Sequence, residues 1–279
     1  MIKFKSFDIN NDFDKVYKFL INNYSYNREN GTEAPFLTYS LCNLKESLIN
    51  KNTIIYDNDK IIGYLGIELG LGEAYFFFSN DLDSDAIKTI IDYAINNLSV
   101  DNHIIMRVYS KQTKLKEELK RLGFSLTGAW KFYDYDYSID INSSLPKGCK
   151  FFDGEIDLIK LKKCIWQGFD NDGDNEDISA LEKIIHHKKY SHMDVIVINE
   201  DNEYVGYCGV WIEERNKLCY LEPLCVISSY RNKGVGKAII AEVIRKTKDL
   251  GLRRMTGGIS DFYKQIGFSS NFRQEIYER

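Results

Sequence analysis

A glycine-rich, basic turn carries the strongest chemical signal in the sequence. It reads Tyr-Arg-Asn-Lys-Gly-Val-Gly-Lys over 230–237, and it joins an apolar run of strand length to an amphipathic helix pattern. The first amides of a helix have no partner within the helix, and the positive end of the helix dipole lies beside them. Gly234 and Gly236 carry no side chain, so an anion such as a phosphate can approach the backbone closely. The basic residues of the turn are Arg231, Lys233 and Lys237.

Two other phosphate-binding motifs do not fit this turn. The Walker loop, GxxxxGK[ST], fails because Asn232 replaces its first glycine and Ala238 replaces its hydroxyl residue. The dinucleotide fingerprint GxGxxG fails because Ile239 stands at its third glycine. The remaining pattern, R-x-x-G-x-G, resembles the coenzyme A pyrophosphate loop of the GNAT family of N-acetyltransferases. The alternative interpretation is a helix start that needs glycines only for packing.

A second segment strengthens the resemblance. Phe262-Tyr263 and Gly267-Phe268 form an F-Y-x-x-x-G-F pattern, which is similar to a later segment of the family, so the resemblance covers about 190–279. It implies acetyl-CoA as the co-substrate and no metal. The residues that it implies for coenzyme binding are Val226, Arg231, Asn232, Lys233, Gly234, Val235, Gly236 and Lys237.

Direct acetyl transfer to an amine requires the amine to lose a proton, an oxyanion to be stabilised and a thiolate to leave. Tyr263 matches the family's tyrosine that protonates the thiolate, and a phenol with a pKa near 10 can act as such an acid. The alternative is a core tyrosine that supports the helix. Glu222 is the candidate base, and the alternative is that it binds substrate or makes a structural hydrogen bond. The resemblance makes the Val226 amide a candidate oxyanion donor. Cys225 has little support as a nucleophile, because no histidine lies near it in sequence.

The chain contains one internal repeat. Gly63 and Gly206 stand in similar segments 143 residues apart, and Phe124 and Phe268 end similar segments 144 residues apart. We therefore expect two tandem domains, 1–143 and 144–279, separated by a linker that contains Pro146. Each half alternates predicted strands and helices. The expected fold is an α/β (α+β mixed sheet) fold: two GNAT-like domains, each a mixed, mostly antiparallel sheet flanked by helices.

The elements expected around the turn follow from periodicity. Strands are predicted over 194–199, 204–213, 220–227 and 253–257, with a last strand toward the C-terminus. Helices are predicted over 13–23, 158–167, 234–250 and 262–266, and Gly251 is expected to end the long one.

The first half lacks the motif residues. The repeat places 88–93 opposite the glycine-rich turn, but this stretch has no glycine and fits an amphipathic helix. Leu119 stands opposite Tyr263. We expect this half to be degenerate toward coenzyme A, with a structural role or one wall of the substrate site. Its aromatic run 75–78 is interpreted as a buried strand.

Composition limits the class of protein. The chain has 279 residues, 44% hydrophobic and 28% charged, which favours packed domains over disorder. A net charge of −4 argues against nonspecific nucleic-acid binding. No apolar run approaches the roughly 18 residues of a membrane helix. Six cysteines without a CxxC pair indicate a reduced, cytoplasmic protein.

Two polar segments have weaker interpretations. The acidic stretch 170–177 predicts a solvated loop that could attract a cationic amine. His186, His187 and His192 are interpreted as helix-end or surface residues rather than a metal site.

The sequence therefore predicts an acetyl-CoA-dependent N-acetyltransferase. Its acceptor would be a small-molecule or peptide primary amine, in a monomer or homodimer without nucleic-acid or membrane partners. The alternative is a non-catalytic coenzyme A-binding sensor or interaction protein.

Overall fold

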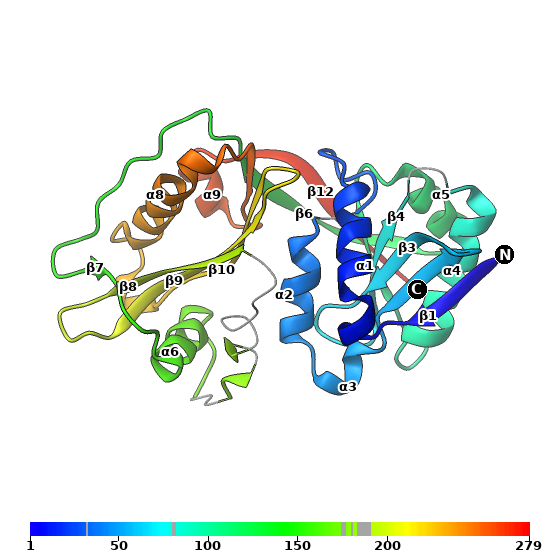
Figure 1. The fold of residues 1–279 in the computed structure, drawn as a ribbon, viewed down its shortest axis with the longest axis horizontal. Coiled ribbons are helices and arrows are strands. Elements are labelled where there is room, and N and C mark those ends of the chain that lie inside the picture. The colour runs from blue at the N-terminus through cyan, green and yellow to red at the C-terminus, as the bar shows by residue number, and fades with distance from the viewer. Residues whose placement is uncertain (32, 80–81, 174–176, 180, 183–190) are drawn as a thin grey trace. The chain divides into compact units, whose positions relative to one another are not determined.

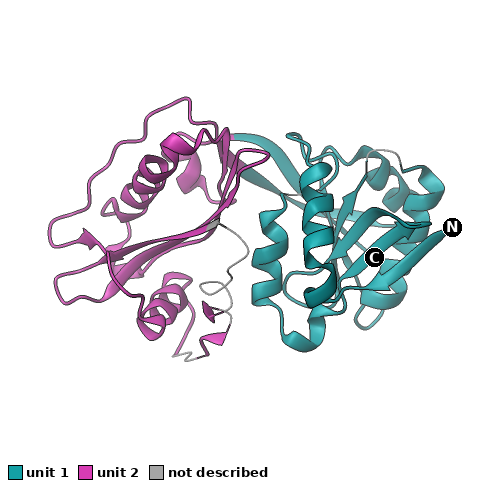
Figure 2. Cartoon of the chain, viewed as in Figure 1, with its two compact units in different colours: residues 1–132, 270–279 teal, residues 133–269 magenta. Residues whose placement is uncertain are grey.

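The computed structural model describes residues 1–279 except 32, 80–81, 174–176, 180 and 183–190. The chain divides into two compact units (Figures 1 and 2). Unit 1 comprises residues 1–132 and 270–279, and unit 2 comprises residues 133–269.

Unit 1 is a mixed sheet flanked by helices. Its strands follow the order β1-β2-β3-β4-β5-β12, and all neighbouring pairs are antiparallel except β4 and β5, which are parallel. Strand β6 begins in this unit and ends in unit 2. The elements are β1 (Ile2–Ser6), α1 (Ile9–Asn22), α2 (Pro35–Asn43), α3 (Glu46–Ile49), β2 (Thr53–Asp57), β3 (Lys60–Gly66), β4 (Glu73–Phe78), α4 (Ser84–Leu98), β5 (Ile105–Tyr109), α5 (Thr113–Arg121), β6 (Ser125–Tyr135) and β12 (Ser269–Glu278).

Unit 2 has the same kind of sheet. Its strands follow the order β7-β8-β9-β10-β11, again with a single parallel pair, β10 and β11. Helices α8 and α6 cover opposite faces of β8, β9 and β10 (Figure 1), each over its own hydrophobic cluster. The elements are β7 (Lys150–Phe151), α6 (Leu158–Gly168), β8 (Ser191–Ile198), β9 (Tyr204–Glu213), β10 (Leu218–Val226), η1 (Ser228–Tyr230), α8 (Val235–Thr247), η2 (Lys248–Leu250), β11 (Arg254–Thr256) and α9 (Asp261–Gln265).

The mixed α/β architecture expected from the sequence is confirmed, and the helix boundaries have local causes. Asp8, Asp157 and Ser260 cap α1, α6 and α9 by accepting backbone hydrogen bonds from the first turn. The predicted long helix is α8 followed by the 3₁₀ turn η2, and it ends at Gly251, whose φ is 62°.

Strand β12 and the end of β6 lie outside the units formed by the rest of their own repeats. Strand β12 pairs with β5 in unit 1, while the end of β6 pairs with β11 in unit 2. The units therefore differ from the contiguous halves 1–143 and 144–279 that the repeat suggests. Strands β6 and β12 follow similar segments, which end at Phe124 and Phe268. The local sequence therefore does not specify which of them pairs with β5 and which pairs with β11.

A buried ion pair stabilises the place of β12 in unit 1. The Arg28 guanidinium hydrogen-bonds to Glu33, and both side chains are almost fully buried. The guanidinium also lies over the ring of Phe272 in β12, 3.5 Å from its centroid, and over Tyr109 at 5.1 Å.

Replacing Arg28 with Met is expected to destabilise the fold by about 3–5 kcal/mol, because the Glu33 carboxylate would stay buried without its partner. Urea unfolding measures this loss. The matched control is Arg245→Met, which breaks an exposed i,i+3 pair with Glu242 and is expected to cost less than about 1 kcal/mol. Equal losses in the two variants would contradict the role assigned to Arg28.

Candidate active site

A cavity of about 580 Å³ opens in unit 2 at the end of β10. It brings together most of the residues that the sequence singled out. Those that line it are Val226, Arg231, Asn232, Gly234, Val235, Gly236, Lys237 and Tyr263. Lys233 and Glu222 are not among its lining residues. Lys233 instead lies over the ring of Tyr230, with Nζ 5.2 Å from the ring centroid.

The turn before α8 has the backbone needed to expose the first amides of the helix. Asn232 and Gly234 have φ values of 59° and 86°, in the left-handed region where glycine is favoured. Gly234 is the N-cap of α8, and a Cβ added to it would meet nothing within 4 Å. The N–H groups of 235–237 come before the first i→i−4 bond, from Ala238 to Gly234, and are the amides left free by helix geometry.

The two glycines of the turn have different local roles. A Cβ on Gly236 would lie 3.2 Å from the Phe262 ring, so this glycine allows α8 and α9 to pack closely. The packing interpretation of the turn therefore applies to Gly236. At Gly234 the backbone conformation and the open space beside it leave room for a ligand.

The Arg231 guanidinium contacts groups of the protein itself and does not simply point toward an anion. Its Nε donates to the carbonyl oxygen of Val226 at 2.9 Å, and its terminal nitrogens contact Gly168 O and the Asp170 carboxylate at 2.8 and 2.7 Å. The side chain therefore joins the end of β10 to the end of α6. Asp170, from the predicted acidic loop, is a partner of the turn, while 174–176 of that loop lie outside the described residues.

Tyr263 projects from α9 into the cavity and is largely buried. Its ring lies against the bare faces of Gly257 and Gly258, where an added Cβ would be 2.8 and 3.1 Å from ring carbons. Burial raises the pKa of its phenol well above the usual value of 10, with further contributions from Cys208 and Glu222, although a backbone hydrogen bond from Gly258 lowers it. The hydroxyl therefore keeps its proton at neutral pH.

Glu222 lies where β10 departs from regular pairing. The register between β9 and β10 shifts between Leu221 and Leu224, which places an irregularity at Glu222 and Pro223. The Glu222 carbonyl accepts a hydrogen bond from the Trp211 indole at 3.1 Å. Its charge acts on both Tyr263 and Cys208 by raising their pKa values.

The position of His192 corrects one prediction. Its side chain is only 7% exposed in β8, so the interpretation as a helix-end or surface residue is wrong for this histidine. His186 and His187 lie outside the described residues. His192 contacts Asp194, which in turn contacts Tyr207. Sequence reasoning missed this group, although two polar residues alternate with apolar ones along 192–195, the pattern of side chains that share one sheet face.

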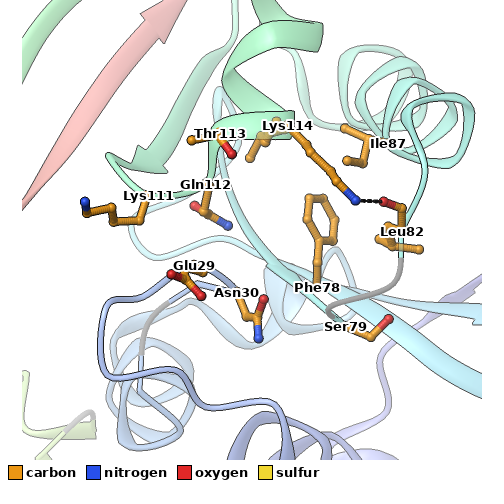
Figure 3. A pocket seen from close by; sticks show the side chains of 11 residues that line it. Glu29, Asn30, Phe78, Ser79, Leu82, Ile87, Lys111, Gln112, Thr113 and Lys114 are labelled. Atoms are coloured by element: carbon orange, nitrogen blue, oxygen red, sulfur yellow. Dashed lines mark hydrogen bonds between the residues drawn. The ribbon is translucent and has the colours of Figure 1, made fainter.

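Unit 1 has a smaller cavity, of about 320 Å³, beside the ends of its own parallel strands (Figure 3). The Gln112 side chain crosses between those strands: Nε2 donates to Phe76 O at 3.1 Å, and Oε1 accepts from Tyr109 N at 2.9 Å. Lys114 reaches across the cavity to the carbonyl oxygen of Leu82 at 2.9 Å. As expected, 88–93 lie inside helix α4, and the aromatic run 75–78 lies in the buried strand β4.

Comparison with known proteins decides the family of the second unit. Residues 157–268 match the model of the acetyltransferase (GNAT) family. These residues form a GNAT domain. The match covers most of unit 2, including the glycine-rich turn and Tyr263. A search of curated proteins finds no match.

Solved structures extend the likeness to the whole chain. A tandem GNAT protein from the clavulanic acid biosynthesis pathway matches with a TM-score of 0.68 at 10% identity, over 100% of this chain and 98% of that one. A GCN5-related N-acetyltransferase from Sphaerobacter thermophilus matches with a TM-score of 0.63 at 12% identity, over 100% and 95%. N-myristoyltransferase from Saccharomyces cerevisiae matches at 0.58 and 13%, over 99% and 78%. The chain thus has the fold of tandem GNAT proteins.

Each helix within the described ranges is too short or too polar to cross a membrane. Among the residues that the structure describes, no group of three or more His, Cys, Asp or Glu side chains is placed to hold a metal ion.

Burial determines the reactivity of the cysteines. Desolvation raises the pKa of Cys219 to about 12, and the pKa values of Cys208 and Cys225 are raised well above the usual value of 9. For Cys225 the main cause of the raised pKa is a side-chain hydrogen bond with Cys164, and burial adds to it. A thiol that holds its proton so firmly is a poor nucleophile.

A disulfide reagent at pH 8 is therefore expected to label Cys149 first, because this residue is only partly buried. Cys208, Cys219 and Cys225 should react only when the protein unfolds. Mass spectrometry of tryptic peptides after timed labelling measures the order. Rapid labelling of Cys225 in the folded protein would contradict this assignment and would reopen a covalent mechanism.

Proposed function

We propose that this protein is an N-acetyltransferase that moves an acetyl group from acetyl-CoA to a primary amine by direct attack. One observation carries the proposal: the exposed N-terminal amides of α8, the open Gly234 and the buried phenol of Tyr263 share a single cavity. The family match adds the chemistry typical of such a cavity. A small-molecule or peptide amine is the proposed acceptor, and the proposed setting is the cytoplasm, as a monomer or homodimer.

The cavity suits a pyrophosphate by its chemistry. The amides of 235–237 offer hydrogen-bond donors at the positive end of the α8 dipole. Lys237 adds a cation in the lining, and Lys233 is the basic residue just before Gly234. Arg231 acts by positioning, because its contacts with Val226 O and Gly168 O stabilise the end of β10 beside the turn. We assign the Val226 amide as an oxyanion donor.

Tyr263 is the proposed general acid. Its raised pKa keeps the phenol protonated, so that it can donate a proton to the departing thiolate. Such a donor must hold its proton until negative charge develops beside it.

Glu222 is the proposed base, because its carboxylate is close enough to Tyr263 to influence its pKa. If Glu222 instead binds the substrate without accepting its proton, replacing it with Gln should leave the pH profile of kcat/KM unchanged. The pH dependence of kcat/KM in Glu222→Gln separates these two roles.

The second candidate is a coenzyme A-binding sensor without turnover. It shares the turn and the cavity but makes no use of the Tyr263 proton. Unit 1 is proposed to be the non-catalytic copy in either case, since Gln112 spans the gap between its parallel strands.

A negative charge introduced at position 234 tests whether the turn binds the coenzyme. Acetyl-CoA should stabilise the wild-type protein against heat, by about 2.7 kcal/mol at a hundred times Kd. Gly234→Asp should abolish the shift, because its carboxylate would stand beside the proposed pyrophosphate site. Gly234→Asn is the matched control, since Asn has nearly the same shape and also tolerates a positive φ.

The stabilisation by acetyl-CoA is compared between the two variants in the same thermal titration. A shift kept by Asn and lost by Asp supports anion binding at the helix start. Equal shifts in both variants, or no shift in the wild-type protein, would exclude the turn as the coenzyme site.

Removing one hydroxyl separates the enzyme from the sensor. Tyr263→Phe should lower kcat about 10²–10⁴-fold, the usual contribution of a general acid, while the affinity for acetyl-CoA stays within about twofold. Turnover against a panel of primary amines and calorimetric binding of acetyl-CoA measure the two quantities. Unchanged kcat would exclude Tyr263 as the acid, and binding without turnover in the wild-type protein would favour the sensor.

A further inference from the structure

Helix α9, which carries Tyr263, is too short to determine its own position. It has five residues, Asp261–Gln265, and it follows the glycine pair Gly257 and Gly258. A single turn of helix has little stability by itself in water, so the place of α9 depends on its contacts with the rest of unit 2. Those contacts determine where the phenol of Tyr263 lies in the cavity.

One residue at the end of β6 makes three hydrogen bonds around this segment. Tyr133 N donates to Gly258 O at 3.2 Å, and Gly257 N donates to Tyr133 O at 2.7 Å. The Tyr133 hydroxyl donates to Oδ1 of Asp261, the first residue of α9, at 2.9 Å. Tyr133 therefore bonds both to the glycine pair beside the Tyr263 ring and to the helix that carries this ring.

The packing of Gly257 connects Tyr133 directly with Tyr263. A Cβ added to Gly257 would lie 2.8 Å from Tyr133 O and 2.8 Å from a carbon of the Tyr263 ring. Tyr133 and Tyr263 are both buried and belong to the same hydrophobic cluster. A displacement of Tyr133 would therefore change the surface against which the Tyr263 ring packs.

The contact with Asp261 anchors the start of α9. This hydrogen bond is the main cause that raises the pKa of Tyr133 above the usual value of 10, so the hydroxyl is a donor at neutral pH. Farther along α9, the Phe262 ring packs against Gly236 at the start of α8. The helix that carries Tyr263 is thus attached to β6 through Asp261 and to the glycine-rich turn through Phe262.

We propose that Tyr133 is a positioning residue that fixes the phenol of Tyr263 in the cavity. It acts through its hydroxyl bond to Asp261 and its backbone bonds to Gly257 and Gly258. This assignment rests on the proposed function for the view that the phenol donates a proton in catalysis. Tyr133 belongs to the first repeat of the sequence but lies in unit 2. Residues 144–279 alone would lack this contact, which gives the exchange of β6 a consequence for catalysis.

Removing one hydroxyl from the full-length protein tests the assignment. Tyr133→Phe keeps the ring but breaks the bond to Asp261. It should lower kcat with a panel of primary amines at least about fivefold, because small misplacements of a reacting group are costly, while the Kd of acetyl-CoA stays within about twofold. Tyr137→Phe is the matched control, since it removes another tyrosine hydroxyl of unit 2, bound to Thr247 at 3.0 Å. It should leave both quantities unchanged.

The acceptor side of the same bond gives a second test. Asp261→Asn keeps an oxygen that can accept from Tyr133 and should keep kcat within about twofold, whereas Asp261→Ala should lose as much as Tyr133→Phe. The double variant of Tyr133→Phe and Asp261→Ala should lose little more than either single variant, because both break one bond. Fully additive losses would overturn the role of the hydroxyl.

A measurement on Tyr263 itself does not require turnover. Tyrosine labelled with ¹³C at Cζ reports the ionisation of each phenol, and Tyr263→Phe assigns the resonance of interest. Because burial raises the pKa of Tyr263 well above 10, this resonance should stay unchanged near pH 10, where exposed tyrosines titrate. In Tyr133→Phe the ring should become more hydrated and its pKa should fall toward 10. In Tyr137→Phe it should stay high.

The outcomes separate the positioning role from the proposed function. A lowered Tyr263 pKa in Tyr133→Phe, with a wild-type protein that lacks transferase activity, would keep the positioning and overturn the proposed function. Active transfer with kcat unchanged in Tyr133→Phe, or a Tyr263 pKa equal in this variant and the wild-type protein, would overturn the positioning. Equal effects in Tyr137→Phe would overturn it as well, because any lost hydroxyl of the unit would then have the same result.

Discussion

The separation of the parallel strands β10 and β11 is the constraint on which the site depends. The two strands pair at only three positions, from Leu218 with Arg254 to Tyr220 with Thr256. Beyond them β10 continues to Val226 through an irregularity at Glu222 and Pro223, while β11 has already ended. Leu224, Cys225 and Val226, at the end of β10 beyond these pairs, line the cavity. The helix α8 begins at the edge of the same cavity.

The same constraint exists in unit 1 and has a different solution. Strands β4 and β5 also pair at three positions and then separate, but the buried amide of Gln112 bonds to both of them. A side chain there supplies the donor and the acceptor that the separated strands need. In unit 2 the residues after β11 are Gly257 and Gly258, which bring no side chain and instead make room for the Tyr263 ring. Parallel strands therefore separate in both units: in unit 1 the Gln112 side chain bonds to both strands, and in unit 2 a cavity lies at the end of β10.

The sequence predicted the local features well because their causes are local. The end of the long helix at Gly251 depends on residues within one or two turns of it. The glycine-rich turn could likewise be recognised from its own residues and its place between a strand and a helix. Strand exchange at β6 and β12 could not, because two similar strands compete for two similar edges that lie far away in sequence. The Arg231 contacts and the contacts of Asp194 with His192 and Tyr207 also depend on long-range packing, which periodicity does not specify.

Proton transfer imposes opposite demands on the two ends of the proposed site. A general acid must keep its proton, and burial against Gly257 and Gly258 meets this demand at Tyr263 by penalising the phenolate. An acceptor amine must arrive as an ammonium ion and lose a proton, which requires negative charge. Glu222, on β10, is the carboxylate whose charge acts on Tyr263. The Glu222 charge favours the neutral phenol as well, since a phenolate beside a carboxylate is disfavoured. One negative charge would therefore attract the amine and hold the acid in its protonated form.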